Sequence, residues 1–121
     1  MTEELASLIE CYRHTPEFMF ADLTDVNSTG MTGDTLLHSA VISASIKDVD
    51  LLIRSGANVY AQGDLGDTPL HHAASRGLLD IADKLIKSGA NRQLENEFGQ
   101  TPTDVATLMR HNELAELLRS K

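Results

Sequence analysis

The chain has 121 residues, 41% of them apolar, and a formal net charge of −8, which is the size of one domain with a continuous core. This composition excludes the collagen-like and disordered classes, and no apolar run approaches the ~18 residues of a membrane-spanning helix. Cys11 is the single cysteine, which excludes an internal disulfide. The acidic start, Met1–Glu4, does not resemble a secretory signal, so we expect a cytosolic protein.

The negative charge is concentrated at one end of the chain. Residues 1–34 carry −6, whereas residues 35–66, 67–99 and 100–121 carry −1, −1 and 0. Such a field repels phosphate backbones, so a nucleic acid partner is not expected, and it attracts a basic protein partner. The alternative is that these acidic residues simply keep a small protein in solution.

Two short helices are expected at the start of the chain, within residues 2–24. The first is indicated by an apolar stripe at helical spacing, formed by Leu5, Leu8, Ile9 and Tyr12. Thr15 and Pro16 have the residue types of an N-cap and a first helical position. The second helix that they open would carry Phe18, Met19 and Leu23.

From residue 33 onward the sequence repeats itself with a period of 33 residues. The segments Gly33–His38, Gly66–His71 and Gly99–Asp104 share one marker, and Ser55–Asn58 returns as Ser88–Asn91 in the same register. A fixed period of this length indicates stacked structural units, and two markers in one register make a chance match improbable.

Local chemistry explains the order of elements within residues 66–98. Thr68 is a good N-cap and Pro69 suits the first helical position, so a helix begins there and runs to Gly77, where the chain can reverse. A second helix follows, with one apolar face formed by Ile81, Ala82, Leu85 and Ile86. Gly89 ends it, and the polar residues 90–98 form an extended loop.

The segment Gly66–Asn91 resembles an ankyrin repeat. The matching residues are Thr68, Pro69, Leu70, His71, Ala73, Ala74, Gly77, Leu85, Gly89 and Ala90. The resemblance covers residues 33–121 and implies an all-α fold, an α-solenoid of stacked helix pairs joined by hairpin-like loops. Four positions depart from the pattern: Leu36 replaces a proline, Ala44 and Arg110 replace the inter-helix glycine, and Asp48 occupies a usually apolar site.

The expected organisation is a single domain, residues 1–121, with about four helix pairs and three loops that project as fingers. Its parts are a divergent N-terminal capping helix pair (1–32), two repeats (33–65 and 66–98) and a C-terminal capping repeat (99–121). Arg119 stands where Ile86 stands in the complete repeat, which is typical of a polar cap on the end of a stack.

The histidines have a structural interpretation. The resemblance implies that His38 and His71 connect adjacent units through hydrogen bonds, with Asp104 in this place in the last unit. His71 and His72 diverge by ~100° on a helix and cannot easily share an ion, so neither a metal nor another cofactor is expected. No phosphate-binding loop or nucleophile motif is present, and we predict that the protein is not an enzyme.

The resemblance also implies that a partner protein lies across the concave side of the stack. The residues expected to contact it are Thr29, Met31, Thr32 and Asp34 in the first finger, Gln62, Asp64, Leu65 and Asp67 in the second, Glu95, Glu97, Phe98 and Gln100 in the third, and Ile42, Ser43, Ser75, Arg76, Leu108 and Met109 on the helices. Apolar residues beside carboxylates are typical of binding hot spots. The alternative is that Leu65 and Phe98 fold back on their loops and Leu108 and Met109 cover the end of the core.

Three functions agree with this interpretation. The first is an adaptor or inhibitor that is monomeric when free and recognises one protein. The second is an immunity-type antagonist that neutralises a basic toxin or effector enzyme, and the third is a structural subunit of a larger complex. No membrane partner is expected.

Overall fold

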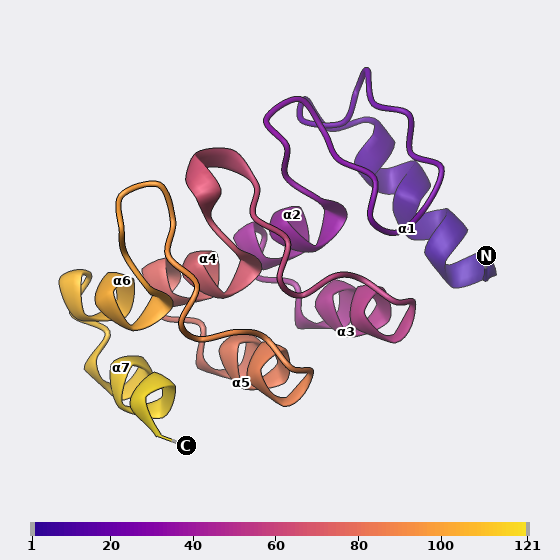
Figure 1. The fold of residues 1–121 in the computed structure, drawn as a ribbon. Helices are drawn as coiled ribbons and strands as arrows, with labels where there is room; N and C mark the ends of the chain where they lie inside the picture. Colours follow the sequence, from indigo (N-terminus) through magenta and orange to yellow (C-terminus); the bar gives the residue numbers. More distant parts are fainter. Residues whose placement is uncertain (1, 121) are drawn as a thin grey trace.

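In the computed structural model, which describes residues 2–120, the helices stack in two rows. Figure 1 shows an inner row of α2 (Leu36–Ile42), α4 (Pro69–Arg76) and α6 (Pro102–Leu108), next to the projecting loops. The outer row contains α1 (Glu3–Arg13), α3 (Ile46–Arg54), α5 (Leu79–Lys87) and α7 (Asn112–Arg119). Within this range a 3-10 turn, η1 (Asp64–Gly66), and an isolated pairing of Thr29 with Thr35 complete the regular structure. The predicted all-α solenoid is confirmed.

The repeated threonines begin the inner helices as the sequence predicts. Thr35, Thr68 and Thr101 have extended backbones, and each hydroxyl oxygen accepts the backbone N–H three residues later. The side chain at that third position accepts the N–H of the threonine in return, which completes a capping box. The 33-residue marker is therefore a helix-starting device, repeated once for each inner helix.

The turn between the two helices of each pair has the same backbone shape whether or not it contains glycine. Gly77 has φ 68°, and Ala44 and Arg110, at the equivalent positions, have φ 58° and 64°. This left-handed conformation costs a residue with a Cβ about 1–2 kcal/mol. The predicted departures from glycine therefore leave the geometry unchanged and place strain in two turns.

Replacing Ala44 by glycine should raise the free energy of unfolding by about 1 kcal/mol, because it relieves that strain. Urea unfolding of the variant and the native chain measures the difference. Gly77→Ala is the matched control and should destabilise, since its Cβ would lie 2.6 Å from Nδ1 of His111. If Ala44→Gly is no more stable than the native chain, the turn does not store the strain assigned to it.

One continuous core runs between the two rows. Its fully buried side chains include Leu36, Leu37, Leu52, Leu70 and Leu85. The predicted inner face of the second helix is confirmed, because Ile81, Ala82 and Leu85 are buried and Ile86 is half-buried. Apolar burial of this kind, at roughly 25 cal/mol per Å², holds successive pairs together.

The N-terminal cap differs from the prediction. The expected apolar stripe is buried on α1, but the second helix predicted after Thr15 and Pro16 is wrong: residues 14–20, here called the N-terminal turn segment, form consecutive turns. The Thr15 hydroxyl donates to the carbonyl of Tyr12 at 2.7 Å and so closes α1 instead of opening a new helix. The stack therefore consists of one outer-row helix followed by three helix pairs.

Phe18 explains why this segment turns. Its side chain is fully buried and packs edge-to-face on Tyr12, with ring centroids 6.3 Å apart. The Tyr12 hydroxyl in turn donates to Oδ2 of Asp48 on α3 at 3.2 Å. Burial, and then the nearby carboxylate, raises the pKa of the Tyr12 phenol. Asp48, the carboxylate at a usually apolar site, is thus the hydrogen-bond partner of the cap.

At the carboxyl end, the predicted polar cap is visible in the contacts of Arg119. Its guanidinium pairs with Glu116 at 2.9 Å and donates to Oγ1 of Thr107 on α6 at 3.2 Å. These contacts lay a polar side chain across the last helix pair. No helix within residues 2–120 has the length and apolar character needed to span a bilayer.

Candidate protein-binding surface

Three hairpin-like fingers project from the inner-row side of the stack, as Figure 1 shows. Each is closed by a backbone hydrogen bond of 2.9 Å, from Gly30 to Asp34, from Gly63 to Asp67 and from Asn96 to Gln100. In all three fingers the donor residue precedes the acceptor residue by the same number of positions in the sequence, so each finger has a tight tip. The predicted hairpin-like loops are confirmed.

The first and second fingers are bonded to each other. Oδ1 of Asp34 accepts the backbone N–H of Asp64 at 2.9 Å. The two backbones approach so closely that a Cβ on Gly63 would collide with this oxygen and lie 3.0 Å from the Cα of Asp34. Asp34 is itself buried. It was predicted to contact a partner, but the structure shows that its carboxylate holds the two fingers together.

The second and third fingers are bonded in the same way. The side-chain amide of Gln62 donates to the carbonyl of Glu95 at 2.9 Å, and the backbone N–H of Glu97 donates to the carbonyl of Leu65 at 3.0 Å. Backbone and side-chain bonds together connect the fingers into one row, which we call the finger row. Such a row presents its side chains in a preorganised arrangement, and this lowers the entropy cost of binding.

Buried histidines fasten the finger row to the inner helices. Nδ1 of His38 accepts the backbone N–H of Thr35 at 3.1 Å, and Nε2 donates to the carbonyl of Asp67 in the next repeat at 2.8 Å. The same pair of bonds recurs one repeat later at His71, Thr68 and Gln100. The histidine role implied by the resemblance is confirmed. Oδ2 of Asp104 instead accepts the N–H of Thr101, within its own repeat.

The predicted contact residues divide into exposed residues and residues that support them. Those that are not exposed are Asp34, Asp67, Ser75 and Gln100. The exposed ones are Thr29, Met31, Thr32, Ile42, Ser43, Gln62, Asp64, Leu65, Arg76, Glu95, Glu97, Phe98, Leu108 and Met109. The four residues that are not exposed bond one repeat to the next. The exposed set lies on the fingers and the carboxyl ends of the inner helices, and it includes Gln62, which also bonds two fingers.

The apolar members of this set face solvent. The residues Met31, Leu65, Phe98, Leu108 and Met109 are between 48% and 70% exposed. None of the five is therefore a buried part of the core. Leu65 also has a left-handed backbone, with φ 58° and ψ 20°. An exposed leucine in a strained conformation is a feature that functional loops retain.

Met19 and Phe20 follow Glu17, which is bonded to the first finger, and they were not among the predicted contacts. Met19 was predicted to lie in a helix of the cap, but it is 55% exposed in the N-terminal turn segment, and the adjacent Phe20 is 84% exposed. A signal was present in the sequence. Consecutive residues on a helix diverge by ~100°, so Phe18, Met19 and Phe20 could not all have reached one core.

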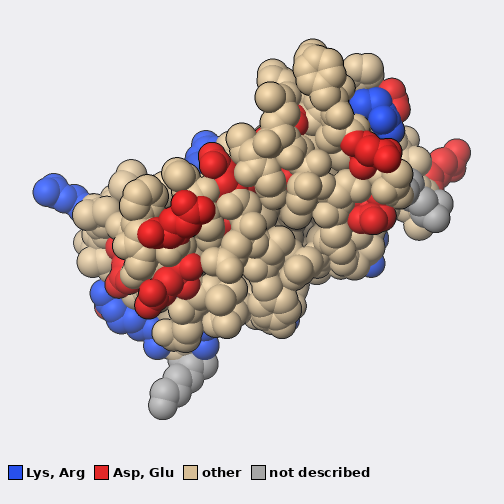
Figure 2. Space-filling view, turned by 45° about the horizontal axis from the view of Figure 1, so that its top comes forward, with Lys and Arg blue, Asp and Glu red and all other residues tan. Residues whose placement is uncertain are grey.

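Figure 2 shows the finger side, where acidic side chains lie in separate groups between uncharged residues, with Lys and Arg toward the edges. The exposed carboxylates of the fingers include Asp64, Glu95 and Glu97. Carboxylates around apolar side chains orient a charged partner and raise its rate of association.

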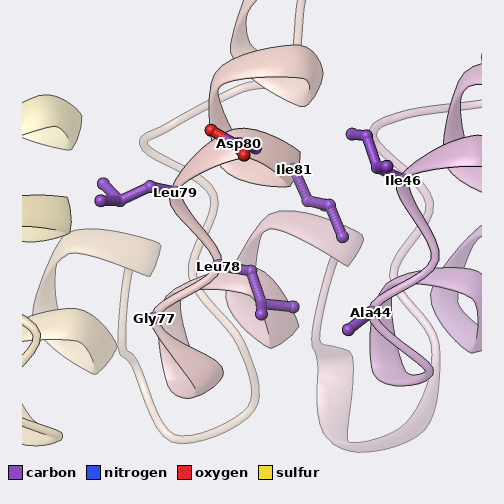
Figure 3. A pocket seen from close by; sticks show the side chains of 7 residues that line it. All are labelled: Ala44, Ile46, Gly77, Leu78, Leu79, Asp80 and Ile81. Carbon is purple, nitrogen blue, oxygen red and sulfur yellow. The ribbon is translucent and has the colours of Figure 1, made fainter.

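One hollow of the surface is lined largely by apolar side chains. This hollow, of about 410 Å³ and shown in Figure 3, lies between the α2–α3 and α4–α5 turns, with Ala44, Leu78 and Ile81 directed toward it and Leu79 directed away. Asp80 is the charged residue of its lining. Among residues 2–120 no three His, Cys, Asp or Glu side chains lie close enough together to hold a metal ion.

A comparison with known families agrees with this architecture. Residues 37–121 match the family described as ankyrin repeats (3 copies). The match covers more than half of the chain, and the chain therefore belongs to the ankyrin-repeat family. Ankyrin repeats are generally protein–protein interaction modules and typically do not catalyse reactions. No curated protein shows significant similarity to the chain.

Proposed function

We propose that this protein is a binding module that holds one partner protein across its finger row and the exposed ends of the inner helices, and acts as an adaptor or inhibitor. The observation that carries the proposal is the set of exposed apolar side chains on a row of fingers bonded to one another. A preorganised surface of apolar anchors surrounded by carboxylates has the composition of a binding hot spot.

Replacing both Leu65 and Phe98 by serine should abolish partner binding and leave the helix content unchanged, because both side chains are exposed and neither is part of the core. The partner is identified by affinity capture on the native chain and mass spectrometry. Its affinity for the native and variant chains is then measured by calorimetry, and circular dichroism reports the helix content.

The matched control is Tyr60→Ser, because Tyr60 is an aromatic residue of similar exposure, 52%, whose hydroxyl lies near Gly89 at the end of α5 in the outer row. It should leave the affinity unchanged. An unaltered affinity in the Leu65 and Phe98 double variant would overturn the concave-surface proposal.

A second candidate function is an immunity-type antagonist of a basic toxin or effector enzyme. It is favoured by the net charge of −6 in residues 1–34. Such an antagonist would use long-range attraction, which salt screens over about 10 Å at 0.1 M. Association with the captured partner should then slow steeply as salt is added, whereas an adaptor that relies on its apolar anchors would show a shallow dependence.

A further inference from the structure

The N-terminal turn segment is bonded to the tip of the first finger. The backbone N–H of Met31 donates to the carbonyl of Glu17 at 2.9 Å. The Glu17 carboxylate accepts the backbone N–H of Thr32 at 2.8 Å and its hydroxyl at 2.6 Å. A Cβ on Gly30 would lie 2.5 Å from the Glu17 carbonyl oxygen, so the two backbones are in close contact. The segment therefore continues the finger row by one more element, as Figure 1 shows.

The same segment is anchored to the core on its other side. Phe18 is fully buried against Tyr12, and backbone bonds from Phe18 to Thr15 and from Ala21 to Phe18, of 3.1 and 3.0 Å, keep the turns closed. With Glu17 bonded to the finger and Phe18 inserted in the core, the following residues are held in place. Met19 and Phe20 are therefore exposed on a segment that is held by contacts on both of its sides.

The chemistry around Phe20 defines the occupant. Phe20 is the most exposed of the large apolar residues in the described chain. It lies three residues after Glu17, which is bonded to the first finger, and three residues span at most about 10 Å. Asp22 and Asp25, both exposed, follow it closely along the chain. Residues 1–34 carry −6. An aromatic anchor beside exposed carboxylates complements a segment that has both apolar and cationic side chains.

We propose that the N-terminal turn segment is a fourth contact element of the finger row, and that it captures a Lys- or Arg-containing amphipathic segment of the partner protein. The apolar side chains of this segment cover Phe20, Met19 and Met31, and its cations face Asp22 and Asp25. This inference rests on the proposed function, because it extends the same surface and names the chemistry of its partner.

The test uses a display library of random peptides of about 12 residues, each long enough to reach roughly 40 Å when extended. The library is selected on the native chain at about 0.15 M salt, where screening still leaves contact pairs intact. The selected peptides should combine Lys or Arg with apolar residues. Their affinity should fall at least about tenfold for Phe20→Ser, as for the loss of a hot-spot side chain, and remain unchanged for Tyr60→Ser.

Other outcomes separate the two proposals. If the peptides lose affinity for the Leu65 and Phe98 double variant but not for Phe20→Ser, the fourth contact element is overturned and the finger row remains a binding surface. Selected peptides without cationic residues would overturn the assigned partner chemistry. Peptides that bind every variant equally would overturn the proposed function as well. Circular dichroism of Phe20→Ser establishes that the variant is folded.

Discussion

Replacing His71 by alanine is expected to lower the free energy of unfolding by about 3 kcal/mol. The substitution removes two bonds of a buried side chain, from Thr68 N–H to Nδ1 and from Nε2 to the Gln100 carbonyl. It leaves both backbone groups without their partner, at about 1–3 kcal/mol for each unsatisfied group, and adds a cavity. Urea unfolding followed by circular dichroism gives the difference.

Asp104→Ala is the matched control, because Asp104 occupies the same position one repeat later. It is exposed and accepts one bond from Thr101, so its loss should cost only about 1 kcal/mol. A comparable loss in the two variants would contradict the conclusion that the histidine bond between repeats, and not the local cap, provides most of the stability at this position.

The second large effect is expected when the pH is lowered, because protonation of His38 and His72 should lower the free energy of unfolding. Burial lowers the pKa of both side chains, although the Asp34 and Asp67 carboxylates act in the opposite direction. The two rings meet edge-to-face at 5.8 Å, and Nε2 of His72 is buried without a hydrogen-bond partner among residues 2–120. After burial, the neighbouring His38 ring is the next largest cause that lowers the pKa of His72.

The sign of the pH effect follows from these lowered values. A histidine whose pKa is lower in the folded state is neutral there, while the unfolded chain takes up protons below about pH 6.5. The contribution of these two neutral histidines to the free energy of unfolding is therefore fully present above about pH 6.5. It is lost as the pH falls toward the pKa that each histidine has in the folded state. Each histidine contributes a slope of up to about 1.4 kcal/mol per pH unit in this window.

His72→Leu should therefore flatten the acid limb of the stability curve. It should also raise the free energy of unfolding at neutral pH by about 1–2 kcal/mol, since it removes an unpaired buried nitrogen and leaves an apolar side chain of similar size. Urea unfolding at several pH values between about 5 and 8 measures both effects.

His72→Gln is the control, because glutamine cannot be protonated but remains polar. It should flatten the curve without the gain at neutral pH. An acid limb as steep in His72→Leu as in the native chain would show that His72 does not contribute to the pH dependence.

These bonds also support the surface that we propose for binding. His38 and His71 each connect an inner helix to the finger that follows, and Asp34 and Gln62 connect one finger to the next. The buried supporting side chains, His38, His71 and Asp34, are therefore distinct from those exposed on the surface, whereas Gln62 belongs to both groups. Substitutions in the first group should lower stability, whereas substitutions of exposed residues such as Phe98 should change affinity alone.

The sequence by itself determined the stack and its register. The threonine caps, the inter-helix turns and the apolar faces of the second helices depend on interactions within a few residues, so their local pattern predicts them. The predicted histidine bonds follow from the same period, because equivalent residues in successive units occupy equivalent places. The five exposed apolar residues were also found in this way, since the fingers follow from the positions of the helices.

Only the tertiary structure determined the conformation of the N-terminal cap. It also determined which of the predicted contact residues are exposed and which support the others. Thr15 and Pro16 have the chemistry of a helix start, but burial of Phe18 against Tyr12 and the bonds from Glu17 to the first finger favour turns instead. Asp34, Asp67 and Gln100 could not be recognised as supporting residues, because their partners lie about thirty residues away in the neighbouring repeat. Contacts between residues so distant in sequence form only when the repeats stack, and this packing also leaves Met19 and Phe20 exposed beside the fingers.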